Sequence, residues 1–326
     1  MLFSSGRRMA RSWAGSAVRT AVSAGAPLSR VSAIAAFGSN PGALRMLVYA
    51  PARLRAGRPL VVVLHGCGQD AGTFAADAGW LALAQQFRLA LLLPEQSYKN
   101  NRGLCFNWFR PDDVRRDAGE AASIRQMIRT AVKRFGSDPR RIFVVGFSAG
   151  GGMAAALLAA YPTVFAAGGV VAGMPVGSAS TPMGAMLHMR RADSRRTRKA
   201  LADDVRAAAR SQSRRIWPRL SIWQGARDRT VAPANAEAVA AQWSELHGCG
   251  SMPAVDEVTS GVRRRAWGRP NRPPSVELWS LAHIGHGFPV DPHTPESGRV
   301  GAWVVDAGLC AAQLMAAFWS LKRPRR

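Results

Sequence analysis

The 326-residue chain lacks any stretch of about 18 or more apolar residues that is free of charged side chains, so the sequence predicts no transmembrane helix. Cysteine is also scarce. The four cysteines include no pair with the C-x-x-C spacing of a structural zinc site, and we therefore expect no such metal. An even number of cysteines permits two disulfides with three possible connectivities, or free buried thiols.

Acidic residues are few, 20 Asp and Glu against 44 Lys and Arg, which gives a formal net charge of +24. Nearly all of this charge lies in residues 1–30, 190–219, 263–272 and 322–326. Such segments could attract nucleic acid, acidic lipid or a granule surface. The arginines are not interleaved with aromatic side chains, however, as a base-stacking surface requires. We therefore interpret them as arginines tolerated in loops and expect no nucleic-acid partner.

What the chain does contain is enough apolar material for a large core, since 48% of its residues are hydrophobic. Apolar runs typical of buried strands alternate with segments of helical spacing, and this alternation predicts a mostly parallel sheet with helices on both faces. The predicted strands are 43–51, 60–64, 89–96, 141–148, 165–173, 219–225 and 275–282. The predicted helices are 74–87, 114–135, 149–162, 233–248 and 300–320.

This pattern predicts a single catalytic domain over residues 41–320. Residues 1–40 are interpreted as a mobile basic arm that resembles a secretory signal only weakly, because Arg19 and Arg30 interrupt its apolar part. Residues 321–326 form a basic tail. The irregular, arginine-rich stretch at about 175–218 is predicted to be an insertion that packs over the active-site end of the sheet.

The residues Gly146-Phe147-Ser148-Ala149-Gly150 fit the pattern G-x-S-x-G between an apolar strand and an Ala-rich helix. In that context the serine lies on a sharp turn that presents its hydroxyl as a nucleophile. Glycines two residues before and after the serine are needed because side chains there would collide across the turn. The alternative is a tight turn without chemistry, and the surrounding pattern favours the catalytic interpretation.

A serine needs a base and an acid to become a nucleophile, and in this kind of turn they follow it in the chain. Asp228 comes just after the predicted strand 219–225, where catalytic groups gather in open α/β sheets. The alternative role for Asp228 is to close a loop or cap a helix. After the last predicted strand come His283 and His286, and we favour His286 as the base because two glycines flank it. His283 is expected to be packed.

An ester carbonyl also needs two hydrogen-bond donors for its developing negative charge. The amide of Ala149 lies at a helix N-terminus, where free N–H groups favour an anion. The segment "LHGCGQD" ends a strand at His65 and Gly66, and the amide of Cys67 is predicted to face that of Ala149. We expect His65 to hold this loop by hydrogen bonds.

Together the stretches "LHGCGQDAGTF", "LLLPEQ", "CFNWFRPDD", "GFSAGGG", "GARDRTV" and "IGHGF" resemble the poly(3-hydroxybutyrate) depolymerase family of esterases over about residues 43–320. The resemblance implies an α/β-hydrolase fold with Ser148, Asp228 and His286 as the triad. It also implies that Cys67 and Cys105 lie close enough for a disulfide. Trp108 and Phe109 would border the groove for the acyl group or polymer.

The expected activity is therefore that of a serine esterase which forms an acyl-enzyme and needs no metal or cofactor. Hydroxyalkanoate esters are the first candidate substrates, and feruloyl or acetyl-xylan esters are the second. The chain differs from the family pattern at Phe288, where Trp is common. A peptidase of the same fold, or a basic binding protein on a hydrolase scaffold, stays open at this point. The resemblance implies an extracellular or periplasmic protein, and the weak signal leaves the cytoplasm as the alternative.

Overall fold

The computed structural model describes residues 28–209 and 216–323, so most of the predicted N-terminal arm and the last three residues of the tail lie outside the described residues. The strands are β1 (Ser32–Ile34), β2 (Arg45–Tyr49), β3 (Leu60–Leu64), β4 (Ala90–Glu95), β5 (Ile142–Phe147), β6 (Ala167–Val171), β7 (Arg219–Gly225), β8 (Val255–Thr259), β9 (Val262–Trp267), β10 (Val276–Leu281), β11 (Phe288–Val290) and β12 (Val304–Asp306). The helices are η1 (Leu28–Arg30), α1 (Ala71–Asp77), α2 (Trp80–Phe87), α3 (Pro111–Val114), α4 (Gly119–Phe135), α5 (Ala149–Ala160), α6 (Pro182–Arg190), α7 (Arg198–Ala208), α8 (Ala234–Leu246) and α9 (Ala311–Phe318).

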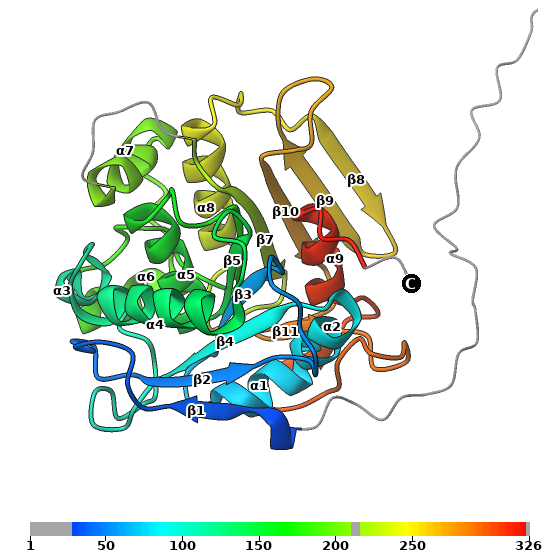
Figure 1. The fold of residues 1–326 in the computed structure, drawn as a ribbon. Helices are drawn as coiled ribbons and strands as arrows, with labels where there is room; N and C mark the ends of the chain where they lie inside the picture. Colours follow the sequence, from blue (N-terminus) through cyan, green and yellow to red (C-terminus); the bar gives the residue numbers. More distant parts are fainter. Residues whose placement is uncertain (1–27, 210–215, 324–326) are drawn as a thin grey trace, which may run out of the picture.

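A ten-stranded sheet forms the centre of the molecule, in the order β1-β2-β4-β3-β5-β6-β7-β10-β9-β8. Neighbouring strands from β4 to β10 pair in parallel, whereas β1 and β2 at one edge and the β8–β9 hairpin at the other pair antiparallel. Figure 1 shows these two antiparallel edges at opposite ends of the sheet. The central strands β3 to β6 are buried throughout, because helices cover both of their faces.

The two faces carry different helices. Helices α4, α5 and α8 pack on one face, and α1, α2 and α9 pack on the other. This arrangement confirms the predicted mostly parallel sheet with helices on both faces. No helix in the described part of the chain combines the length and the apolar character that crossing a membrane requires.

Several predicted elements differ in their boundaries. The predicted helix 74–87 is two helices, because Gly79 between them has a φ of 81°. The predicted helix 114–135 begins only at Gly119, after a positive φ at Asp117. Pro94 lies inside β4 rather than ending it, beyond the stretch that pairs with β3, where the strand has a neighbour on one side only.

The predicted helix 300–320 was wrong over its first half, which contains the strand β12 paired in parallel with β11. The prediction of a loose arm up to residue 40 also fails for its last part, because β1 pairs with β2 and adds a strand to the sheet. The short strands β1 and β11 have no clear apolar run in the sequence, and β12 lies in an apolar run with helical spacing, so all three are recognised only by their pairing with other strands.

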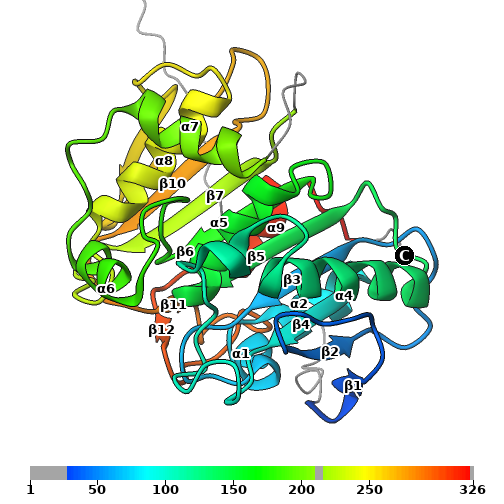
Figure 2. The ribbon, with the colours of Figure 1, turned by 90° about the vertical axis from the view of Figure 1, so that its left-hand side faces the viewer.

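The predicted basic insertion at 175–218 is not irregular where it is described, since it contains α6 and α7. Helix α7 packs against α8 and α5, away from the active-site end of the sheet, and Figures 1 and 2 both show it beside α8. Helix α6 instead contacts the loop after β7, where Met189 O accepts a hydrogen bond from the Ala232 amide at 2.7 Å. The predicted packing of the insertion over the active-site end is therefore not confirmed.

Many arginines of the internal basic segments pair with acids of the same chain. In the hairpin, Arg264 reaches the buried Glu277 at 3.1 Å, and Arg263 and Arg265 pair with Asp256 and Glu237. In α7 and the turn before it, the pairs are Arg196–Asp204, Arg198–Glu245, Lys199–Asp203 and Arg206–Asp203. The interpretation of residues 263–272 as a tolerant loop was thus wrong for residues 263–267, which form β9.

Candidate active site

The turn from β5 to α5 carries Ser148 in a strained conformation, with φ 55° and ψ −117°. Its amide donates to Val171 O at 2.9 Å, which fixes the turn to the neighbouring strand β6. A side chain on Gly146 would overlap the backbone of Gly150, and one on Gly150 would overlap the carbonyls at the end of β3. These close approaches explain why glycine stands at both positions, and why the helix begins against the sheet.

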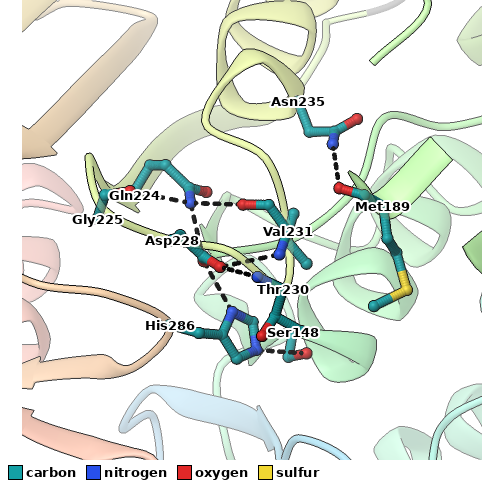
Figure 3. Close-up of polar contacts among 9 residues, drawn as sticks. All are labelled: Ser148, Met189, Gln224, Gly225, Asp228, Thr230, Val231, Asn235 and His286. Carbon is teal, nitrogen blue, oxygen red and sulfur yellow. Dashed lines mark hydrogen bonds and ion pairs between the residues drawn. The ribbon is translucent and has the colours of Figure 1, made fainter. Parts of the chain in front are cut away.

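Ser148, His286 and Asp228 form one continuous chain of hydrogen bonds (Figure 3). The Ser148 Oγ lies 3.0 Å from His286 Nε2, and His286 Nδ1 lies 2.7 Å from Asp228 Oδ2. Because a carboxylate can only accept, Nδ1 carries the proton and Nε2 is free to accept one from the serine hydroxyl. This is the arrangement required of a nucleophile, a base and a group that orients the base.

Asp228 is held in place by donors on all sides. The amides of Thr230 and Val231 both donate to its Oδ1 at 2.8 Å, and Gln224 Nε2 donates to Oδ2 at 2.9 Å. Burial by itself raises the pKa of Asp228, but the hydrogen bond and charge of His286, together with these two amides, outweigh it and hold the pKa below its usual value. Asp228 is therefore a carboxylate at neutral pH.

The other histidine candidate lies elsewhere. His283 is exposed rather than packed, and its ring lies beside Gly261 in the β8–β9 turn. Gln224, the residue before the last of β7, faces Asp228 (Figure 3) and was not predicted from the sequence. A buried glutamine near a strand end gave no signal, because its partners follow four and seven residues later in a loop.

The loop after β3 contains Cys67 and is fixed from several directions. Gly66 N donates to Gln69 Oε1 at 2.7 Å, and His65 Nε2 accepts from the Gln96 amide at 3.1 Å. Since Nε2 accepts, the proton lies on Nδ1, which donates to Gly66 O at 2.7 Å. Burial lowers the pKa of His65, so it stays neutral and structural. Among the described residues, the Cys67 amide donates to no backbone carbonyl.

A second loop, residues 96–109, lies against the first. Cys67 and Cys105 form a disulfide between the two loops, and Gly68 N donates to Gly103 O at 3.0 Å. Cys249 and Cys310 are free thiols. Trp108 packs its ring on Gly152 in the first turn of α5, so tightly that a side chain at Gly152 would collide with it. Phe109 packs edge-on against Trp108, with ring centroids 5.6 Å apart.

Glu120, near the start of α4, holds the second loop from beneath and was not predicted from the sequence. Its two oxygens accept four hydrogen bonds, from the side chains of Gln96 and Asn100 and from the amide and side chain of Asn107, at 2.7 to 2.9 Å. Burial raises the pKa of Glu120 to about 8, although the hydrogen bonds to its carboxylate offset part of that effect.

Within 28–209 and 216–323, no group of three or more His, Cys, Asp and Glu side chains is placed to hold a metal ion. The groups that follow one another from Ser148 are an imidazole and a carboxylate, an arrangement suited to nucleophilic acyl transfer.

Comparison with known proteins finds relatives that are named as a depolymerase and as an esterase. The chain is 36% identical over 287 residues to "Poly(3-hydroxyalkanoate) depolymerase C" of Paucimonas lemoignei, covering 87% of this chain and 69% of that protein. It is 30% identical to "Feruloyl esterase B" of Thermothelomyces thermophilus, covering 79% and 87% of the two chains.

The fold has a close structural counterpart in an acetyl xylan esterase from Aspergillus awamori, with a TM-score of 0.75 and 21% identity over 90% of this chain and 99% of that one. This likeness confirms the predicted α/β-hydrolase fold. The model of the family described as "Esterase PHB depolymerase" matches residues 44–266. Since that match covers more than half of the sequence, the chain belongs to the esterase PHB depolymerase family.

Proposed function

We propose that this carboxylic-ester hydrolase works through Ser148 as nucleophile, His286 as general base and acid, and Asp228 as the group that orients His286. The observation that carries the proposal is the unbroken set of hydrogen bonds from Ser148 Oγ through His286 to a carboxylate held ionised. The side chain of Asp228 is fully buried and that of His286 nearly so, which strengthens their interaction.

The reaction begins when Ser148 Oγ attacks the ester carbonyl and His286 Nε2 takes its proton. The charged imidazole is stabilised by Asp228, and the carbonyl oxygen becomes an oxyanion. His286 then gives the proton to the departing alcohol oxygen, which leaves an ester between Ser148 and the acyl group. A water molecule, deprotonated by His286, releases the acid and restores Ser148.

The amides of Cys67 and Ala149 are the proposed donors to the oxyanion. Ala149 is the first residue of α5, whose free N–H groups favour negative charge. The tight contact between Gly150 and the end of β3 supports the placement of the Cys67 loop beside it. Removal of one such donor typically costs about 3 kcal/mol of transition-state stabilisation.

Hydroxyalkanoate esters are the first proposed substrates and feruloyl or acetyl-xylan esters the alternative, following the names of the relatives. Trp108 and Phe109 are proposed to contact the acyl group, since Trp108 packs on Gly152, which lies one helical turn after Ser148. A panel of soluble hydroxybutyrate oligomers, a feruloyl ester, acetylated xylan and polymer granules would rank these classes by kcat/KM.

The Cys67–Cys105 disulfide supports an extracellular or periplasmic site of action, because disulfides persist in oxidising compartments. We propose that the protein acts there. Detection of the disulfide in protein purified from its own compartment, by a mass shift after reduction and alkylation, would test this. A fully reduced pair would contradict the proposal.

The decisive experiment on function compares the wild type with Ser148→Ala. The variant should lose on the order of 10⁴-fold or more in kcat on a short-chain nitrophenyl ester, and a fluorophosphonate should label the wild type alone. Ser251→Ala is the matched control and should keep full activity, because Ser251 is exposed and belongs to none of the segments that carry Ser148, Asp228 and His286. Retained hydrolysis by Ser148→Ala would overturn the proposed mechanism.

A further inference from the structure

Trp303 stands out because its large apolar side chain is 53% exposed beside the active site. Its ring packs edge-on against His286, with centroids 5.9 Å apart and planes at 70°. The proposed mechanism gives this residue no role. An exposed indole does little for the core, whereas indole rings often bind apolar groups of ligands.

The turn that carries Trp303 is fixed rather than loose. Its carbonyl accepts from Phe288 N at 2.8 Å, two residues after His286, and Gly301 and Val304 exchange backbone hydrogen bonds. Trp303 has a φ of 60°, in the left-handed region that costs a residue with a side chain on the order of 1 kcal/mol. The chain thus holds the ring at its place against a local preference.

Gln69 ties the same turn to the proposed oxyanion loop. Its Nε2 donates to Ala302 O at 2.6 Å, and its Oε1 accepts from Gly66 N at 2.7 Å. One nearly buried side chain therefore connects the residue before Cys67 with the residue before Trp303. The position of the indole is set relative to the nucleophile, the base and the oxyanion donors together.

The side of the substrate that meets Trp303 follows from what His286 does. His286 Nε2 must come within hydrogen-bond reach of the departing alcohol oxygen, about 3 Å, to protonate it. Two aromatic rings pack on the imidazole, Phe147 and Trp303, and Phe147 is buried. Trp303 is therefore the one of these two rings whose exposed surface can meet a ligand group that approaches the imidazole, as the departing alcohol must.

We propose that Trp303 forms a binding site for the alcohol half of the ester and selects alcohols with an apolar body, aromatic or of several carbons, over methanol and ethanol. This inference rests on the proposed function, because it takes His286 as the group that protonates the alcohol. It also separates the two halves of the substrate: Trp303 contacts the alcohol, and the segment with Trp108 contacts the acyl group.

The test uses two ester series with the full-length protein. In the first, a constant butyryl group is joined to methyl, hexyl and phenyl alcohols. In the second, the methyl alcohol is constant and the acyl chain varies. Trp303→Ala should lower kcat/KM at least about tenfold for the hexyl and phenyl esters, and less than about threefold for the methyl esters of every acyl chain. Trp303→Phe should restore part of the loss.

Val300→Ala provides the matched control, because Val300 is 58% exposed in the same segment, and it should leave both series unchanged. The hydrolysis rate of the butyryl-enzyme, measured after rapid acylation, should be unchanged in Trp303→Ala since the alcohol has already left. A loss that is equal for all alcohols, follows the acyl chain or is absent would overturn the inference. If the wild type hydrolyses no ester, or Ser148→Ala stays active, the proposed function itself fails and this inference with it.

Discussion

Two of the buried carboxylates, Asp228 and Glu120, have similar surroundings and pKa values that shift in opposite directions. Each is nearly or fully buried and accepts at least four hydrogen bonds in the loops around Ser148. Yet the pKa of Asp228 lies below its usual value, whereas the pKa of Glu120 is raised to about 8.

The difference lies in what each carboxylate faces. Burial raises both pKa values, but Asp228 contacts His286, which can carry a positive charge, while the partners of Glu120 are neutral and the nearby Asp113 is another acid. At Glu120, the hydrogen bonds from neutral donors offset only part of the effect of burial. Asp228 has in addition a partner that becomes a cation during the proposed reaction, and the described partners of Glu120 include none.

The largest effect is expected on the Asp228 side. Asp228→Asn should lower kcat by about 10⁴-fold, because the amide can no longer hold the His286 tautomer that accepts the serine proton or stabilise the imidazolium. Kinetics on a short-chain nitrophenyl ester measures this. Asp256→Asn, at an exposed carboxylate of the hairpin, is the control and should keep its activity. A loss below about tenfold for Asp228→Asn would show that His286 does not depend on this carboxylate.

Changes in the loop that Glu120 holds should lower the free energy of unfolding. Cys105→Ser removes the disulfide that joins the two loops over a sequence separation of 38 residues, which is expected to cost about 4 kcal/mol of unfolding free energy by loop-closure entropy. Urea denaturation measures the change. Cys249→Ser, at a free thiol, should change stability little. Equal stability of Cys105→Ser and wild type would mean that Glu120 and its partners hold the second loop without the bridge.

The sequence predicted the Asp228 side far better than the Glu120 side, for a physical reason. Ser148, Asp228 and His286 each follow a strand within a short local pattern, and the parallel sheet gathers such strand ends at one edge. In the sequence, Glu120 has the pattern of an ordinary acidic residue in the first turn of an amphipathic helix. Its partners Gln96 and Asn107 come from a loop whose path depends on tertiary packing, so no spacing reveals them.

Other elements were predicted wrongly because their sequence pattern does not show the structure that they form. Three arginines in β9 hide the alternation of a strand, because Arg264 and Arg265 are paired with acids of other elements. The apolar run around residue 304 looked helical, since only its pairing with β11 marks it as a strand. Trp303 was missed for the same reason: a residue in a predicted helix has no expected place beside His286.

Stability should depend on pH through Glu120. Its folded pKa of about 8 lies above the value near 4.5 of the unfolded chain, so the folded state retains a proton that the unfolded state loses between these values. The contribution is full below about pH 4.5 and is lost as pH rises through about 8, on the order of 5 kcal/mol. Urea denaturation from pH 5 to 9 should show this decline relative to Glu120→Gln.

The glutamine variant is suited to this comparison because it cannot titrate and keeps one acceptor oxygen. Its lost hydrogen bond lowers stability by an amount that does not vary with pH, and all other titrating groups are common to both proteins. The difference between the two curves therefore isolates Glu120. If the stabilities of the wild type and Glu120→Gln change in parallel from pH 5 to 9, the pKa of Glu120 is not raised. Glu120 would then be ionised in the folded protein, as Asp228 is.

The smallest effect tests whether His286 alone sets the state of Asp228. Gln224→Met removes the donor to Asp228 Oδ2 and keeps the volume of the side chain. A hydrogen bond to a charged group contributes about 1.5 kcal/mol or more, so kcat/KM should fall about tenfold. Without this donor the Asp228 carboxylate is more basic, so the acidic limb of the pH–rate profile, at which the Asp228–His286 pair takes up a proton, should move to higher pH. Gln242→Met, at a buried glutamine that bonds only backbone atoms near α7, is the matched control. It should lose stability without moving the profile, because its amide touches no ionisable group. An unmoved profile in Gln224→Met would leave His286 and the two loop amides as sufficient to keep Asp228 charged.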